Sequence, residues 1–252
     1  MKIVSLAPSN TEILYAIGAG DQVVGVTTFC DYPPEAKAKQ KVGGWTNVDY
    51  EAIRALAPDV VITSTSVQDV AAQKCREMGL NVLHIDPKNL SEVFDSIHRL
   101  GQLVGMQSGA ELVVQMMRLK IDEVVKRVEG GSMRPRVYAE EWHKPPFVCG
   151  NWIPELIQLA GGESLLKEGR SREVGLEEVK AFDPHYMIVT WCGFGERAQA
   201  ELIRYREGWE DVYAVKNGRI FVFDDSYLNR PGPRLVEGLE LLARTIHPEM
   251  FS

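Results

Sequence analysis

The stretch YEAIRALAPDVVITS at residues 50–64 recurs in altered form as LEEVKAFDPHYMIVT at residues 176–190, an offset of 126 residues. Each copy reads as a short helix, a proline that cannot continue a helix, and an apolar strand. The identical positions are Glu51 and Glu177, Ala55 and Ala181, Pro58 and Pro184, and Ile62 and Ile188. This repetition, half a chain apart, predicts two units of the same α/β type.

Short apolar runs alternate with segments of helical period along the rest of the chain, which indicates βαβ units with mainly parallel strands. Strands are expected at residues 2–7, 22–27, 59–64, 81–86, 136–141, 185–190 and 218–223. Helices are expected at residues 10–18, 49–56, 68–78, 152–160, 175–182, 196–205 and 233–246. The predicted fold class is α/β, with two Rossmann-like lobes of mainly parallel sheet.

A longer helix is predicted between the two halves. Residues 107–129 carry apolar side chains at helical spacing up to a glycine pair, and a helix of that length would span roughly 35 Å at ~1.5 Å per residue. We interpret it as a backbone helix that joins the lobes and limits their closure on binding to a small movement. A helix buried within a single sheet domain is the alternative. The expected organisation is a lobe at 1–105, the helix at 106–131 and a lobe at 132–252.

Composition narrows the class of partner. The chain has 252 residues with 28 Lys or Arg and 35 Asp or Glu, a net charge of −7 that leaves no basic patch for nucleic acid. No apolar run approaches the ~20 residues that cross a bilayer, so no transmembrane segment is expected. Free buried thiols, rather than disulfides or metal ligands, are expected at the widely spaced Cys30, Cys75, Cys149 and Cys192.

Aromatic residues gather where ligands are expected to bind. Open α/β sheets bind ligands beyond the carboxyl ends of their strands, and two such lobes facing each other would enclose a groove. The aromatic residues expected to line it are Phe29, Tyr32, Trp45, Trp142, Phe147, Trp152, Trp191, Phe194 and Tyr227. A groove of this kind suits a broad, mostly apolar ligand with polar edges. For each tryptophan the alternative is packing within its own lobe.

Five stretches carry a resemblance to a known family: VSLAPSNTEILYAIGAGDQVVGVT (4–27), CDYPPEA (30–36) with GGWTNVD (43–49), YEAIRALAPDVVIT (50–63), PPFVCGNWIPELIQLAGG (145–162) and SYLNRPGPRLVEGLELLA (226–243). With these motifs the chain resembles the cobalamin-binding proteins of the helical-backbone class of substrate-binding proteins. These receptors serve ABC importers of corrinoids, haem and siderophores. The resemblance covers essentially the whole chain.

The resemblance implies a corrinoid held in an aromatic cleft between the lobes, with no cofactor of the protein's own. Tyr32 and Trp45 match pocket residues of the first lobe, and Phe147 those of the second, with Trp142, Trp191 and Tyr227 nearby. A permease dimer of an ABC importer is the implied partner.

Docking to that partner is implied for one acidic residue on each lobe, Asp69 and Glu196. The alternative is that both are favourable acids in the first turn of a helix. The family works outside the cytoplasmic membrane, whereas the start MKIVSLAPSN lacks the features of a secretory signal. We expect an extracytoplasmic location if the native signal is missing from this sequence. A cytoplasmic location, with a corrinoid binder that serves no transporter, is expected if Met1 is the natural start.

Other readings of the sequence are weaker. Glu140 and Glu141 are adjacent on a predicted strand, so they point to opposite faces and cannot act as a facing acid–base pair. GxGxxG, GxSxG and HExxH motifs are missing, so an enzyme is not expected. Haem or a ferric siderophore are the alternative ligands. Groups that would serve them are Tyr32, His143 or Tyr227 as axial ligands of a bound metal, and Lys144, Arg197 and Arg230 as cations.

Overall fold

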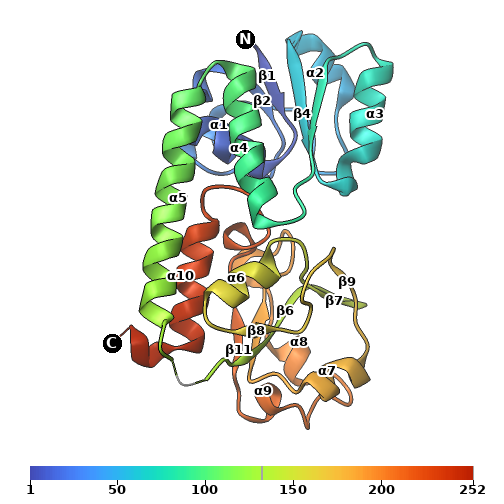
Figure 1. The fold of residues 1–252 in the computed structure, drawn as a ribbon. Coiled ribbons are helices and arrows are strands. Elements are labelled where there is room, and N and C mark those ends of the chain that lie inside the picture. Colours follow the sequence, from blue (N-terminus) through green and yellow to red (C-terminus); the bar gives the residue numbers. More distant parts are fainter. Residues whose placement is uncertain (132, 252) are drawn as a thin grey trace. The chain divides into compact units, whose positions relative to one another are not determined.

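The computed structural model describes residues 1–131 and 133–251. The chain divides into two compact units: unit 1 comprises residues 1–87 and 91–116, and unit 2 comprises residues 88–90 and 117–252. Each unit contains one sheet (Figure 1). The α/β fold with two mainly parallel sheets is therefore confirmed, while the lobe boundaries at 105 and 131 stay a prediction.

Unit 1 is built on a fully parallel sheet in the order β3-β2-β1-β4-β5. Its strands are β1 (Ile3–Ser5), β2 (Val23–Val26), β3 (Gln40–Lys41), β4 (Val60–Ser64) and β5 (Val82–Ile85). Its helices are α1 (Pro8–Ala16), α2 (Tyr50–Leu56), α3 (Asp69–Glu77) and α4 (Leu90–Val104), with 3-10 turns η1 (Gly20–Gln22), η2 (Pro34–Ala38) and η3 (Ser66–Gln68). Ile53 of α2 and Cys75 of α3 pack with Val4, Leu6 and Val61 in a buried apolar cluster on one face of this sheet.

Unit 2 contains a mixed sheet in the order β11-β10-β6-β7-β9, with β8 paired to β6. Its strands are β6 (Arg136–His143), β7 (Pro146–Val148), β8 (Glu163–Ser164), β9 (Arg172–Glu173), β10 (Tyr186–Val189) and β11 (Ile220–Val222). Its helices are α6 (Ile153–Leu159), α7 (Leu176–Phe182), α8 (Glu201–Arg204), α9 (Tyr213–Lys216) and α10 (Leu235–Ile246), with 3-10 turns η4 (Gly195–Arg197), η5 (Asp225–Tyr227) and η6 (Pro248–Met250). Side chains of α7, α8 and α9 share one buried cluster with β6 and β10.

The long helix predicted at residues 107–129 is present as α5 (Gln107–Val128), and the division between the units falls within it, after Met116 (Figure 1). Its buried residues recur at helical spacing: Ala110, Val114, Met117, Ile121 and Val124. At its start the packing is close, because a Cβ on Gly109 would lie 2.4 Å from the carbonyl oxygen of Ile17. Glycine at this position lets α5 approach the end of α1.

The sequence repeat is a repeat of structure. Helix α2 and strand β4 correspond to helix α7 and strand β10 at the same offset of 126 residues, from 50–56 to 176–182. Each helix ends on a non-glycine residue in the left-handed region, Ala57 with φ 44° and Asp183 with φ 46°. The proline follows in both copies, so the chain leaves the helix and enters the strand in the same way.

Two elements differ from the expectation. The single helix predicted at 196–205 is a 3-10 turn followed by the four-residue helix α8, because Ala198 is extended, with φ −60° and ψ 140°. No strand is expected from the sequence at Pro146–Val148, which forms strand β7, antiparallel to β6. Polar residues near these positions weaken the apolar period, so the pattern alone did not define the elements.

Two further predictions concern the cysteines and membrane-spanning helices. Cys30, Cys75 and Cys149 are buried free thiols as predicted, whereas Cys192, also free, is exposed and the prediction for it was wrong. Within residues 1–131 and 133–251, no helix has the length and apolar character required to span a membrane.

Candidate functional site

Three aromatic residues of unit 1 lie in two neighbouring loops after β2 and β3. The loops are joined by a hydrogen bond of 2.9 Å from the Thr28 N–H to the Gly43 carbonyl. A Cβ on Gly44 would lie 3.6 Å from the Phe29 ring, so this ring is close to the loop that carries Trp45. Phe29 and Tyr32 are each 44% exposed and Trp45 is half-buried, so unit 1 presents aromatic surface at this point.

Unit 2 gathers four rings at the carboxyl ends of β6 and β10. The His143 ring centroid lies 4.6 Å from that of Trp191, 5.3 Å from that of Trp142 and 5.8 Å from that of Phe194. Trp142 and Phe194 meet edge to face at 5.9 Å. Such offset and edge-to-face arrangements are the favourable ones for aromatic pairs. Trp142 is 40% exposed and Trp191 is 1% exposed, so the cluster has an outer and an inner member.

A buried ion pair lies directly beneath this cluster. Arg206 donates two hydrogen bonds to the Glu140 carboxylate, at 2.7 and 2.8 Å. The same carboxylate accepts from the Tyr138 hydroxyl at 2.6 Å and from the Trp191 indole N–H at 3.0 Å. Glu140 is fully buried, and every bond it accepts offsets part of the cost of removing its charge from water.

Protonation equilibria in this region follow from burial and from Glu140. Burial raises the pKa of Tyr138, and the neighbouring carboxylate raises it further. Burial opposes the charge of Arg206, but its hydrogen bonds to Glu140 raise the pKa of Arg206. Sequence reasoning rejected Glu140 as a catalytic acid but did not find its structural role. Arg206 lies 66 residues away, so no local pattern connects the two.

Glu141 has a separate environment. Its carboxylate accepts a hydrogen bond of 2.7 Å from Ser171, whose hydroxyl accepts the Gly150 N–H at 2.9 Å. Burial raises the pKa of Glu141, and the bond from Ser171 opposes that change. The two adjacent glutamates therefore have different partners, as their positions on a strand predict.

The loop after β10 is shaped by a residue that the sequence did not single out. Asp225 accepts hydrogen bonds from the Gly193 N–H at 3.0 Å and the Gly195 N–H at 2.8 Å. Arg197 donates to the carbonyls of Gly193 and Phe194 at 3.2 Å. This loop places Phe194 in the aromatic cluster and leaves Glu196 exposed.

The remaining aromatic candidates of unit 2 occupy different surroundings. Phe147 is half-buried on β7 and pairs with Trp142 across the β6–β7 hairpin. Trp152 is 3% exposed, and its indole N–H donates to the Leu228 carbonyl at 2.7 Å. Tyr227 is half-buried beneath the Arg234 guanidinium, which lies 4.6 Å from its ring centroid. Trp152 and Trp191 therefore support neighbouring groups from the interior of this structure, and ligand contact by either stays a prediction.

In unit 1 the acidic candidate Asp69 begins α3 and is exposed. Its carboxylate lies 3.3 Å from Nε2 of His84, whose Nδ1 is 2.8 Å from the Thr63 hydroxyl. Asp69 and Glu196 occupy corresponding places, in the segments that follow β4 and β10.

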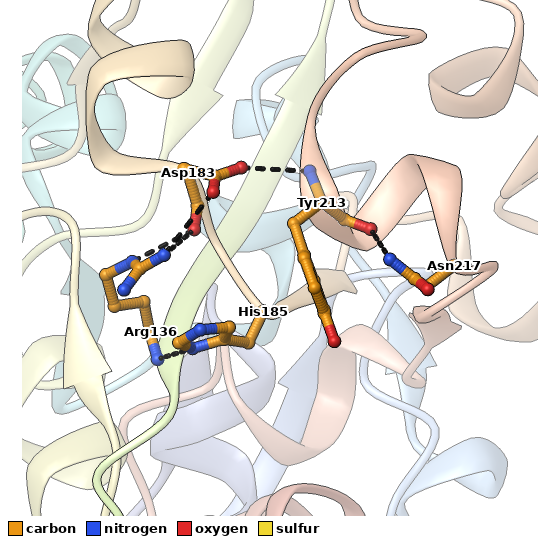
Figure 2. A network of polar contacts seen from close by, with 5 residues as sticks. All are labelled: Arg136, Asp183, His185, Tyr213 and Asn217. Atoms are coloured by element: carbon orange, nitrogen blue, oxygen red, sulfur yellow. Dashed lines mark hydrogen bonds and ion pairs between the residues drawn. The ribbon is translucent and has the colours of Figure 1, made fainter.

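His185 belongs to a network at the opposite end of the unit 2 sheet, where β6 begins (Figure 2). Its Nδ1 accepts the Arg136 N–H at 2.9 Å, while the Arg136 guanidinium donates to the Asp183 carbonyl. The Asp183 carboxylate accepts the Tyr213 N–H at 2.9 Å, and Asn217 donates to the Tyr213 carbonyl at 2.8 Å. Partial burial, together with the charge of Arg136, lowers the pKa of His185. These contacts give His185 a structural role.

Among residues 1–131 and 133–251, no group of three or more metal-ligating side chains is assembled. The structure thus brings together Trp142, His143, Trp191 and Phe194 in unit 2, and Phe29 with the Trp45 loop in unit 1. Both groups lie at the carboxyl ends of strands, the position at which open α/β sheets bind ligands.

Comparison with protein families matches residues 3–227 to the family described as periplasmic binding protein. An uncharacterized ABC transporter substrate-binding lipoprotein of Bacillus subtilis, YvrC, is 32% identical over 99% of this chain and 81% of its own length. Two solved structures are also similar. The periplasmic vitamin B12-binding protein BtuF of Vibrio cholerae has a TM-score of 0.79 and 26% identity over 98% of this chain and 96% of its own. The periplasmic haem-binding protein RhuT of Roseiflexus sp. RS-1 has a TM-score of 0.85 and 25% identity over 99% and 98%.

Proposed function

The chain belongs to the periplasmic binding protein family, and we propose that it binds a corrinoid through aromatic side chains of both units and delivers it to an ABC importer. The observation that supports this ligand class is the exposed aromatic surface: Phe29 and Tyr32 at 44% and Trp142 at 40%. Burying large, flat apolar side chains that are exposed to water is favourable, so a ligand that covers them would bind tightly. Similarity to a vitamin B12-binding protein supports the same choice.

The charge around the aromatic groups favours a ligand without strong negative charge. Arg206 is paired with the buried Glu140 carboxylate and is not presented to a bound anion, and the guanidinium of Arg197 donates to two loop carbonyls. A corrinoid carries neutral amide side chains around an apolar macrocycle, which fits an aromatic surface with few charges. A ferric siderophore, which carries more polar and anionic groups, fits less well.

Visible spectroscopy tests the ligand directly. The protein is mixed in turn with cyanocobalamin, cobinamide, haemin and a ferric siderophore, then desalted, and the retained bands are read. Retention of either corrinoid at a stoichiometry of about one, with Phe29→Ala and Trp142→Ala both weakening it, is the expected result. Retention of haemin or of the siderophore in place of both corrinoids would contradict the proposal.

Haem is the second candidate, and one observation favours it. Within residues 1–131 and 133–251, the Nδ1 atom of His143 is buried and has no hydrogen-bond partner, in a cluster of aromatic rings that a macrocycle could extend. An imidazole nitrogen with no other bond can coordinate iron once the rings that cover it move aside. If haemin binds, the His143→Ala variant should shift the absorption bands of the complex. Unchanged bands would remove this residue as an axial ligand.

We also propose that Asp69 and Glu196 are the docking residues for the importer. Both carboxylates are exposed and lie in corresponding segments of the two units. Exposed apolar side chains lie close to Asp69 in the chain, at Val67 and Val70, and the exposed Tyr205 directly follows α8. An exposed acidic group with apolar neighbours is suited to a protein partner that supplies a positive charge.

The docking proposal is tested with the cognate importer in liposomes. Asp69→Lys should strongly reduce ligand-dependent ATP hydrolysis while leaving ligand affinity unchanged. Glu77→Lys, at the far end of the same helix, is the matched control and should retain activity. Equal activity of Asp69→Lys and the control would contradict the proposal.

Because relatives in this family are substrate-binding proteins, we further propose that the ligand leaves chemically unaltered. Mass spectrometry of the released ligand tests this proposal.

A further inference from the structure

One buried amide of unit 1 is bonded to three separate backbone segments. The Gln68 side-chain oxygen accepts the Ser64 N–H at 2.9 Å. Its amide nitrogen donates to the Leu6 carbonyl at 2.8 Å and to the Trp45 carbonyl at 2.9 Å. Gln68 is 1% exposed, so its amide has exchanged water for these partners. The three bonds join the ends of β1 and β4 to the loop that carries Trp45.

The chain makes an unfavourable turn to bring this amide into place. Thr65, directly after β4, has φ 55° and ψ 162°, a region that β-branched residues rarely adopt. The Gln68 N–H bonds the Thr65 carbonyl at 3.0 Å, and the side chain returns to the strand that the chain has just left. A conformation of this cost persists where surrounding contacts hold it, and the amide supplies three such contacts.

The Trp45 loop is held internally by its own bonds, at its base by the Thr28 N–H bond to the Gly43 carbonyl, and at its tip by Gln68. The Gly44 N–H bonds the Asn47 carbonyl at 3.1 Å, and the Asp49 N–H bonds the Val42 carbonyl at 3.0 Å, which closes the loop on itself. These bonds fix the shape of the loop but do not fix its direction relative to the sheet. The bond from Gln68 to the Trp45 carbonyl links the loop tip to the strand ends.

We propose that Gln68 is the positioning residue of the ligand site in unit 1, because its amide fixes the backbone of Trp45 and thereby the place of the indole. This inference rests on the proposed function only in assigning ligand contact to Trp45. Gln68 itself is interior and acts through Trp45, so its removal should alter the presentation of the indole before it alters the fold.

The test combines a readout without ligand and a readout with cyanocobalamin. In Gln68→Met, which keeps the shape and removes all three bonds, the indole N–H resonance of Trp45 should shift or broaden. Trp45→Phe assigns that resonance, and the resonance of Trp209, in the core of unit 2, should stay in place. Cyanocobalamin affinity should fall about ten-fold, and this loss should shrink to about two-fold or less when Trp45 is already alanine.

Ile53→Val is the matched control. Ile53 is fully buried in the unit 1 core, so shortening it lowers the stability of this unit without removing a hydrogen bond of the Gln68 amide. An unmoved Trp45 resonance in Gln68→Met, or an affinity equal to that of Ile53→Val, would overturn the proposal. So would a ten-fold loss that persists in the Trp45→Ala background. If the wild-type protein retains neither cyanocobalamin nor cobinamide, the proposed function fails, and the Trp45 resonance still decides the role of Gln68.

Gln68→Glu keeps the question answerable if Gln68→Met does not fold. The carboxylate retains an acceptor for Ser64 but faces two carbonyl oxygens without a proton to donate. Affinity should therefore be weak at high pH and recover as pH falls, because a protonated carboxyl can donate to the Trp45 carbonyl. A pH profile parallel to that of the wild type would count against positioning.

Discussion

The two units use different side chains to join the starts of two neighbouring parallel strands, β1 and β4 in unit 1 and β6 and β10 in unit 2. In unit 1 the Asp59 N–H bonds the Lys2 carbonyl at 2.8 Å, and the Asp59 carboxylate accepts the Lys2 N–H at 2.6 Å. In unit 2 the His185 N–H bonds the Arg136 carbonyl at 2.8 Å, and the imidazole accepts the Arg136 N–H at 2.9 Å. The junction therefore requires an acceptor at this position, and the sequence repeat does not preserve which one.

A second difference lies beneath the candidate aromatic residues. Unit 1 supports the Trp45 loop with the neutral amide of Gln68, whereas unit 2 supports Trp191 with the charged pair of Glu140 and Arg206. A neutral amide that loses its partners costs the desolvation of one polar group, but a buried ion that loses its partner leaves an uncompensated charge. The two halves should thus respond very differently to loss of the supporting group.

Removing the charge in unit 2 should have the largest effect on stability. Glu140→Gln leaves the Arg206 guanidinium half-buried without its counter-ion, and we expect a loss of about 3–5 kcal/mol in the free energy of unfolding. Gln68→Met in unit 1 should cost only about 1–3 kcal/mol. Urea denaturation measures both values. A double variant, Glu140→Gln with Arg206→Met, should recover part of the loss because neither charge remains, and equal costs for the two single variants would remove the contrast.

Removing one exposed ring from each unit should have the next largest effect, now on ligand binding. Phe29→Ala and Trp142→Ala each remove a partly exposed aromatic, and we expect each to weaken corrinoid binding about ten-fold, or ~1.4 kcal/mol. Stability should change little, because neither ring is in the interior. Titration followed by visible absorption measures the affinities. A loss confined to one unit would show that the ligand contacts that unit alone.

The sequence predicted most of the fold because its strongest signals are local. The helix–proline–strand repeat located α2, β4, α7 and β10, since proline and apolar period act within a few residues. The apolar spacing of residues 107–129 located α5 to within one residue at its C-terminal end, where Val128 is the last helical residue. The prediction for 196–205 failed because the extended Ala198 interrupts the helix, and the turn that leads into this segment is held by Asp225, a residue about thirty positions later in the chain.

The site was less predictable for the same reason. Position near the end of a strand selected these residues, and the structure gathers Trp142 on β6 with Trp191 and Phe194 of the segment after β10. Position does not tell which ring faces water: Trp142 and Trp191 both lie near strand ends, yet one is 40% exposed and the other 1%. The groups that decide this, Glu140 and Arg206, come together only through tertiary contacts.

Ala57 and Asp183 occupy the same left-handed conformation in the two units, and replacing each by glycine should change stability by a small amount in opposite directions. Ala57→Gly relieves a backbone conformation that alanine adopts at a cost, so the free energy of unfolding should rise by about 0.5–1 kcal/mol. Asp183→Gly relieves the same conformation but removes the acceptor of the Tyr213 N–H (Figure 2), and it should lower stability by about 1 kcal/mol. Thermal unfolding checks both signs. An equal rise in both variants would mean that the carboxylate of Asp183 contributes nothing.

The smallest effect expected is on the pH dependence of stability. The pKa of His185 is lowered in the folded state, so the unfolded chain binds a proton at higher pH than the folded one. Its contribution is therefore complete above the ordinary histidine pKa of about 6.5 and declines as pH falls toward the lower folded value. His185→Asp, which copies the acceptor of unit 1, should move this decline below about pH 4, where an aspartate takes up its proton. Urea denaturation between these two pH values compares the proteins. Identical pH profiles would show that protonation of His185 contributes nothing to the pH dependence of stability in this range.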